Sequence, residues 1–148
     1  MPPRLPPALA YQAALYRIDA TPALLLRIGQ HHPALAALHR QYHSRHSLIL
    51  TACNPRSRLL RPAANRRRTQ ALRHALAQLD RPWLPACGLD PTRIWPDEPG
   101  FWIPGLPLAQ GLGLARRFRQ NAIVWCPDGQ AAQLVWIPAA APAAAGLC

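Results

Sequence analysis

The feature that most constrains the fold is a short, continuous apolar run in the middle of the chain, residues 47–51 (SLILT). It has the length of a strand and shows no alternation of polar and apolar residues, which is typical of a strand buried on both faces. We therefore predict that this strand lies centrally in a sheet. Asn54-Pro55, a strong turn signal, follows it closely, so residues 51–55 are predicted to form a polar turn that closes the strand.

Other apolar runs predict further strands, at 15–18, 24–28, near 83–87, 101–103, 122–126 and 133–137. Apolar residues at three- and four-residue spacing predict helices over 33–44, from 62 or 65 to 79, and from 107 onward. The third helix is expected to turn Leu108, Leu112, Ala115 and Phe118 inward and to be weakened by Gly111 and Gly113, by ~1 kcal/mol each. This order predicts an α+β fold, a single domain with a largely antiparallel (mixed) sheet covered by three helices.

The length of 148 residues and the 50% hydrophobic content suit one domain with one core, which we place at residues 10–137. The first nine residues carry four prolines, and residues 138–148 are mostly Ala and Pro, so both ends are expected to be irregular. No apolar run reaches the ~20 residues of a membrane span, and no secretory signal is evident. With four scattered cysteines, this predicts a cytoplasmic protein. No cofactor is predicted.

The charge is strongly unbalanced, with 17 basic against 6 acidic residues and a net charge of +11. All the basic residues are arginine, which suggests a GC-rich coding bias, so the choice of arginine over lysine says little about function. No acidic residue lies between Asn54 and Leu79. The candidate surface for nucleic acid or another anion comprises Arg56, Arg58, Arg61, Arg66, Arg67 and Arg73, and Arg116, Arg117 and Arg119 form a smaller patch.

We interpret the region from Arg56 to Arg68 as binding an anionic partner, a nucleic acid or a phosphate-bearing ligand, chiefly through phosphates. The alternative is a solvated basic surface without a partner, because no recognised nucleic-acid motif accompanies the charge. A third interpretation is a structural module for protein–protein interaction, which requires an exposed apolar patch.

A second candidate site combines polar residues from the end of the central strand, the start of the second helix and two later segments. It comprises Thr51, Asn54, Ser57, Asn65, Arg68, Glu98 and Gln120. The start of a helix favours anions, and helical spacing turns Asn65 and Arg68 inward. In a small-molecule or enzymatic pocket, Arg68 would hold an anionic group and Glu98 would act as acid, base or orienting partner. In an architectural alternative, Asn65 is an N-cap and Arg68 pairs with Glu98.

Two weaker signals do not favour a site. His39 and His43 have a spacing that can hold a metal, but no carboxylate is near them, so we predict a solvated face and no metal. Cys53 lies beside the polar turn without an identifiable base, so we expect a small core thiol.

Several segments together resemble an uncharacterised bacterial family, the domain-of-unknown-function family numbered three-two-nine-three. They are Ala10-Tyr11 with Tyr16-Arg17-Ile18, Leu26-Arg27-Ile28-Gly29, Thr51-Ala52 with Asn54-Pro55-x-Ser57, Asn65 followed by Arg68 and Leu72, Trp95-Pro96-x-Glu98, Gly105, and Phe118-x-Gln120-Asn121-Ala122-Ile123. The resemblance covers nearly all of residues 10–137 and implies little about function. Where the family pattern places a serine, two residues after Glu98, this chain has Gly100.

Overall fold

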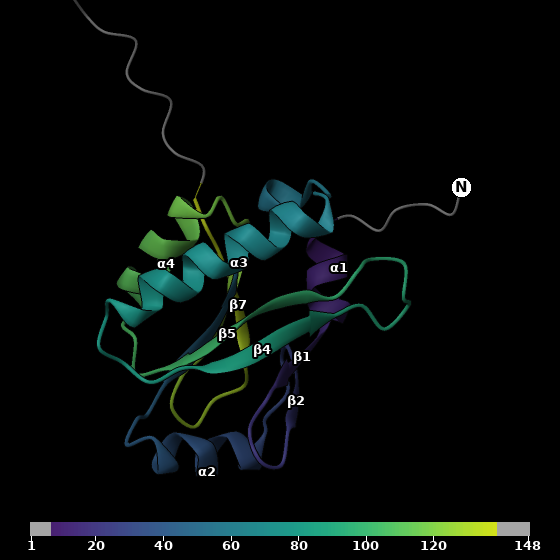
Figure 1. Ribbon diagram of the computed structural model, residues 1–148. Helices are drawn as coiled ribbons and strands as arrows, with labels where there is room; N and C mark the ends of the chain where they lie inside the picture. The colour runs from purple at the N-terminus through teal and green to yellow at the C-terminus, as the bar shows by residue number, and fades with distance from the viewer. Residues whose placement is uncertain (1–6, 139–148) are drawn as a thin grey trace, which may run out of the picture.

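The computed structural model describes residues 7–138 and shows a curled sheet with helices on both sides (Figure 1). The strands and the three predicted helices follow the predicted order, and two short helices, α1 and η1, are additional. They are α1 (Pro7–Ala13), β1 (Leu15–Ile18), β2 (Leu24–Arg27), α2 (Pro33–Gln41), β3 (Ser47–Thr51), the short 3-10 helix η1 (Pro55–Ser57), α3 (Pro62–Ala77), β4 (Leu84–Leu89), β5 (Glu98–Pro104), α4 (Leu108–Arg117), β6 (Ala122–Cys126) and β7 (Gln133–Trp136).

The sheet has seven strands in the order β2-β1-β4-β5-β3-β6-β7, and every neighbouring pair is antiparallel. The fold is thus α+β, as predicted. The apolar run 47–51 forms β3, which lies between β5 and β6 and buries residues 47–50. Burial on both faces explains its lack of alternation.

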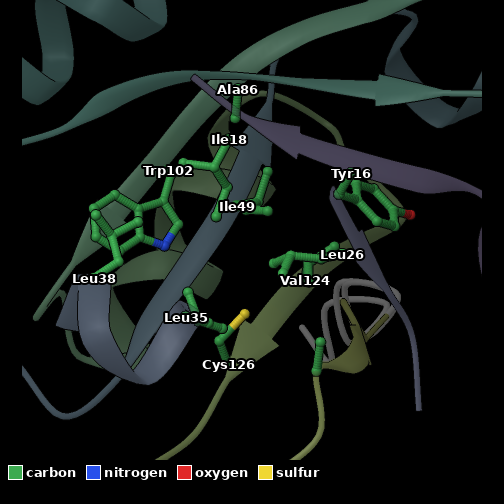
Figure 2. Packing of buried hydrophobic residues seen from close by; sticks show 11 residues of the cluster. Tyr16, Ile18, Leu26, Leu35, Leu38, Ile49, Ala86, Trp102, Val124 and Cys126 are labelled. Atoms are coloured by element: carbon green, nitrogen blue, oxygen red, sulfur yellow. The ribbon is translucent and has the colours of Figure 1, made fainter. Parts of the chain in front are cut away.

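The sheet is curled into a half-barrel, and one core cluster fills its concave face. This cluster takes Ile18 from β1, Leu26 from β2, Trp102 from β5 and Val124 from β6, and α2 adds Leu35 and Leu38 (Figure 2). The backbone N–H of Gly29, after β2, donates to the carbonyl of Ala132, before β7, at 2.8 Å. Elements near opposite edges of the sheet therefore approach each other, and α2 covers one end of the interior (Figure 1).

Helices α3 and α4 lie side by side on the convex face (Figure 1), over a second cluster that includes Leu50, Leu72, Phe101 and Ile123. Gly111 of α4 has a packing role that helix propensity does not reveal. It is buried against β3, and a Cβ at this position would overlap Cδ2 of Leu48. Gly111 therefore permits the close approach of helix and sheet, whereas Gly113 is exposed with nothing within 4 Å of such a Cβ.

Some predicted boundaries were wrong. Helix α1 begins at Pro7, inside the stretch expected to be irregular, because proline is tolerated in the first turn of a helix. Helix α2 ends at Gln41, three residues before the predicted end, and His43 has a positive φ of 52°. Most of the residues that were expected to be irregular, 1–6 and 139–148, lie outside the described part of the chain. None of the helices within residues 7–138 is long and apolar enough to span a bilayer.

Candidate functional site

The turn between β3 and α3 has an unusual backbone. Asn54, Arg56 and Ser57 have φ values of 47°, 52° and 59°, in the left-handed region that residues other than glycine seldom adopt. Each such residue costs on the order of 1–3 kcal/mol, so the surrounding contacts must hold the turn in place.

Asn54 supplies the first of these contacts. Its Oδ1 accepts hydrogen bonds from the backbone N–H of Leu60 at 2.9 Å and from Nδ2 of Asn65 at 2.8 Å. In return, Oδ1 of Asn65 accepts the backbone N–H of Asn54 at 2.9 Å. The two side chains thus bind each other reciprocally. Asn65 lies inside α3, whose N-cap is Arg61, so the expectation that Asn65 caps this helix was wrong.

Glu98 lies at the start of β5 and binds the same asparagine. Its Oε1 accepts Nδ2 of Asn54 at 3.0 Å and Nε1 of Trp95 at 2.6 Å. Burial raises the pKa of the Glu98 carboxyl, and the two hydrogen bonds partly oppose this. Between the described residues there is one ion pair, Arg17 with Asp19, so the expected pair of Arg68 and Glu98 is not formed.

Three of the predicted residues bind main-chain carbonyls instead. Arg68 donates from Nε to Ala52 O at 2.6 Å and from Nη2 to Phe118 O. Gln120 donates from Nε2 to Cys53 O at 3.1 Å and also to Phe118 O. Thr51 donates from Oγ1 to Pro99 O at 2.8 Å. Arg68 is therefore inward, as helical spacing predicted, but it ties the turn to the end of α4. Burial lowers the pKa of Arg68, and the charge of Arg119 lowers it further.

Around the predicted Ser57 and Glu98, the structure adds three residues that sequence reasoning missed, Tyr11, Tyr16 and Asn121. Ser57 Oγ accepts Nδ2 of Asn121 at 2.9 Å and lies 3.2 Å from the hydroxyl of Tyr11. The hydroxyl of Tyr16 donates to the carbonyl of Tyr11 at 3.3 Å. Tyr11 lies in α1, Tyr16 in β1 and Asn121 directly before β6, so no local pattern links them. The available signal was the family resemblance, because Tyr11, Tyr16 and Asn121 all lie in the segments that carry it.

The polar cluster has a defined place in the half-barrel. Glu98 and Trp102 point to the same face of β5, and Trp102 belongs to the concave core near α2. A Cβ at Gly88 would lie 3.7 Å from the Tyr16 ring and 3.9 Å from Glu98 Cβ, so these side chains share that face. Glu98 thus lies at the other end of the interior, near α1. We call this cluster the mouth site: Tyr11, Tyr16, Asn54, Ser57, Trp95, Glu98 and Asn121.

The candidate anion surface runs from the turn after β3 along α3, which lies on the convex side. All six of its arginines, Arg56, Arg58, Arg61, Arg66, Arg67 and Arg73, are exposed. We call them the arginine surface. None of them makes an ion pair with a described carboxylate. Between α3 and α4 lies an open hollow of ≈ 390 Å³, lined by Arg67, Arg68 and Arg117 among others. Arg73 instead lies over the ring of Trp83, 5.3 Å from its centroid.

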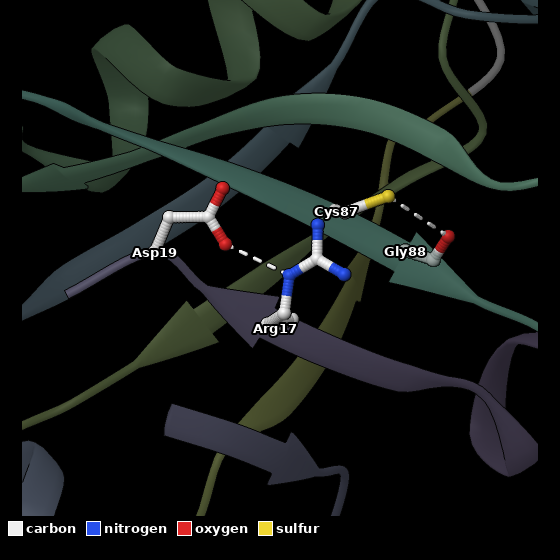
Figure 3. A network of polar contacts seen from close by, with 4 residues as sticks. All are labelled: Arg17, Asp19, Cys87 and Gly88. Atoms are coloured by element: carbon white, nitrogen blue, oxygen red, sulfur yellow. Dashed lines mark hydrogen bonds and ion pairs between the residues drawn. The ribbon is translucent and has the colours of Figure 1, made fainter. Parts of the chain in front are cut away.

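A second hollow, of ≈ 310 Å³, lies where α3 meets β1 and β4, and Arg17, Asp19 and Cys87 contribute to its lining. Nε of Arg17 donates to Asp19 at 2.8 Å, and the Cys87 thiol donates to Gly88 O (Figure 3). Burial raises the pKa of Cys87 to about 11, so this thiol is a weak nucleophile at neutral pH.

The cysteine and histidine candidates differ in how deeply they are buried. Cys53 is buried, as expected of a core thiol. His39 was expected on a solvated face, but it is buried and its Nε2 lies 2.7 Å from Ser47 Oγ. His43 is exposed. Within residues 7–138, no three His, Cys, Asp or Glu side chains are placed to hold a metal ion.

A protein-family model described as "Protein of unknown function (DUF3293)" matches residues 50–123. The chain belongs to this family. No curated protein and no solved structure matches it. The match runs from β3 into β6 and includes Asn54, Ser57, Glu98 and Asn121 of the mouth site. Tyr11 and Tyr16 lie outside the matched residues. Helix α1 and strand β1 therefore add to the mouth site two residues that the family model does not cover.

Proposed function

We propose that this DUF3293 protein binds nucleic acid, and that the arginine surface, together with Arg117 of α4, contacts its phosphates. The observation that carries the proposal is the set of arginines on and beside two adjacent helices that no described carboxylate neutralises. Arg67 of α3 and Arg117 of α4 line one hollow on either side of the tethered Arg68, so their guanidinium groups can approach one phosphate together.

The extent of the arginine surface favours a polymer over a single small anion. Its residues run from Arg56, before α3, to Arg73, in the penultimate turn of a helix of 16 residues. At 1.5 Å per residue this helix is about 24 Å long. One small ligand cannot reach both ends, whereas a chain of phosphates passes several arginines in succession. Such contacts position the nucleic acid without reading its sequence.

Fluorescence anisotropy with labelled single strands and duplexes, measured over a salt series, tests this proposal. In the double variant Arg67→Gln/Arg117→Gln, we expect the slope of log K against log salt to fall by about 0.7–0.9 for each lost phosphate contact. The matched control is Arg40→Gln/Arg45→Gln, which removes the same charge from exposed positions at and beyond the end of α2.

The control should keep the wild-type slope. Equal losses in both double variants would show a general effect of net charge and overturn the proposal. Binding that does not depend on salt would overturn it as well. A competition arm with free mononucleotide separates polymer binding from the capture of one phosphate group, since the proposal predicts weak competition.

A further inference from the structure

The mouth site contains one carboxylate, that of Glu98, which has no part in the phosphate contacts proposed for the arginine surface. Glu98 is mostly shielded from solvent in a chain with 17 basic residues, yet its described partners are two neutral donors, Trp95 Nε1 and Asn54 Nδ2. Neutral donors orient a carboxylate without cancelling its charge. Because no described cation pairs with Glu98, its negative charge is open to a ligand.

Only one oxygen of this carboxylate is occupied. Both hydrogen bonds end on Oε1, at 2.6 and 3.0 Å, and Oε2 accepts none from the described residues. Trp95 and Asn54 thus fix the orientation of the carboxyl group and leave one acceptor for an additional donor. A carboxylate oxygen can accept up to two hydrogen bonds, so Oε2 is well suited to a ligand N–H.

The surrounding groups offer both kinds of hydrogen bond and aromatic surface. Ser57 and Tyr11 present hydroxyls that can donate or accept, and Asn121 presents an amide. Tyr11, Ser57, Trp95 and Asn121 are only partly buried. The end of a barrel interior is a common place for a ligand site. A flat heterocycle with N–H groups and acceptor atoms on its edge can form hydrogen bonds with these groups.

The mouth site also adjoins the arginine surface. Asn54 contacts both Glu98 and Asn65 of α3, and Arg56 and Arg58 flank Ser57 in the same turn. Both arginines are exposed. A phosphate held by these guanidinium groups would bring the attached nucleoside toward the mouth of the half-barrel.

We propose that the mouth site holds one unpaired base of the bound nucleic acid, with Oε2 of Glu98 accepting a hydrogen bond from an amino group on the base edge. The proposal rests on the function proposed above. Adenine, cytosine and guanine carry such an amino group, whereas uracil carries none and offers one N–H between two carbonyl oxygens that repel a carboxylate. The protein should therefore prefer single-stranded A and C tracts over U tracts.

The test compares labelled homopolymers of A, C and U, single-stranded RNA in each case, with wild type and Glu98→Gln. The glutamine Oε1 can still accept from Trp95 and Asn54, while an amide donor replaces the acceptor Oε2. We expect the preference for A and C over U to fall by about tenfold, the lower range for one specific base contact. The salt slope should not change, because no phosphate contact is lost.

The matched control is Asp128→Asn, which makes the same charge change at an exposed turn far along the chain from the mouth site. A second variant, Gly88→Ala, adds a methyl group between Tyr16 and Glu98 at ordinary contact distances of 3.7 and 3.9 Å. It should fold, narrow the site and weaken binding to all three homopolymers with an unchanged salt slope. Thermal melting of each variant verifies folding.

The outcomes separate the two proposals. If wild type binds A, C and U tracts equally, or if Glu98→Gln keeps the wild-type ranking, base recognition at the mouth site is wrong. The arginine-surface proposal still stands in that case, provided that Arg67→Gln/Arg117→Gln lowers the salt slope. If that double variant binds like wild type, the proposed function itself is wrong. A preference for free mononucleotide over homopolymer would assign the site to a small ligand instead.

Discussion

At the scale of single residues, another buried polar contact lies at the opposite end of the half-barrel from the mouth site. His39 is 5% exposed, its Nε2 lies 2.7 Å from Ser47 Oγ, and its ring stacks on Trp102. Burial lowers the pKa of His39, and nearby His46 lowers it further while Asp128 opposes the shift. In the unfolded chain the pKa is about 6.5. Below that value the unfolded state binds more protons, so His39 stabilises the fold at neutral pH and loses this contribution as the pH falls.

We therefore expect the free energy of unfolding to decrease as the pH falls from about 7 to about 5, and the decrease to be smaller in His39→Gln. The matched control is His43→Gln, because His43 is exposed just beyond the same helix. Urea unfolding at several pH values gives the comparison. If His39→Gln and wild type show the same pH dependence, His39 does not contribute it.

At the scale of elements, two glycines of α4 give opposite expectations for the same substitution. Gly111→Ala would drive a methyl group into Leu48, and overpacking of this kind costs about 1–3 kcal/mol, more than the ~1 kcal/mol gained in helix propensity. Gly113→Ala meets nothing within 4 Å and should stabilise the protein by about 0.5–1 kcal/mol. Midpoints of urea unfolding measure both changes. A stabilising Gly111→Ala would contradict the close packing of α4 on β3.

The same two glycines show what the sequence could and could not predict. Strands and helices follow from short-range patterns, and β1, β3 and β6 have the predicted bounds. Both glycines look alike in such a pattern, because only the packing of α4 on β3 distinguishes them. Likewise, helical spacing predicts that Arg68 points inward, but it does not predict which groups lie within hydrogen-bond distance of its guanidinium. The partner of Arg68 is therefore a pair of carbonyls and not the predicted Glu98.

Local sequence patterns could not predict the contacts of the mouth site, because these contacts join segments that are far apart in the chain. Tyr11 and Ser57 lie 46 positions apart, and Ser57 and Asn121 lie 64 apart. The curl of the sheet brings these segments together, and sheet register follows from pairings that no single segment encodes. The seven predicted polar residues do gather around one turn, because Asn54 and Asn65 flank the strand-to-helix connection. Only the three-dimensional structure separates those that bind main-chain carbonyls from those of the mouth site.

At the scale of the whole molecule, the charge is poorly balanced by internal pairing. The net charge is +11, and the one ion pair within the described residues, Arg17 with Asp19, is at the surface. A surface pair of this kind contributes at most about 1 kcal/mol. Repulsion among the exposed arginines thus outweighs attraction, and it destabilises the compact state. A bound polyanion would relieve that repulsion, which connects the charge to the proposed function.

Screening by salt should relieve the same repulsion without a ligand. At 0.1 M salt the Debye length is ≈ 10 Å, shorter than the α3 helix along which the arginines are spread. We expect the melting temperature to rise when sodium chloride increases from about 0.01 M to about 0.3 M. Arg67→Gln/Arg117→Gln should show a smaller rise, since two of the repelling charges are gone. A melting temperature that falls over this range would mean that favourable charge pairs dominate, contrary to the single ion pair found in residues 7–138.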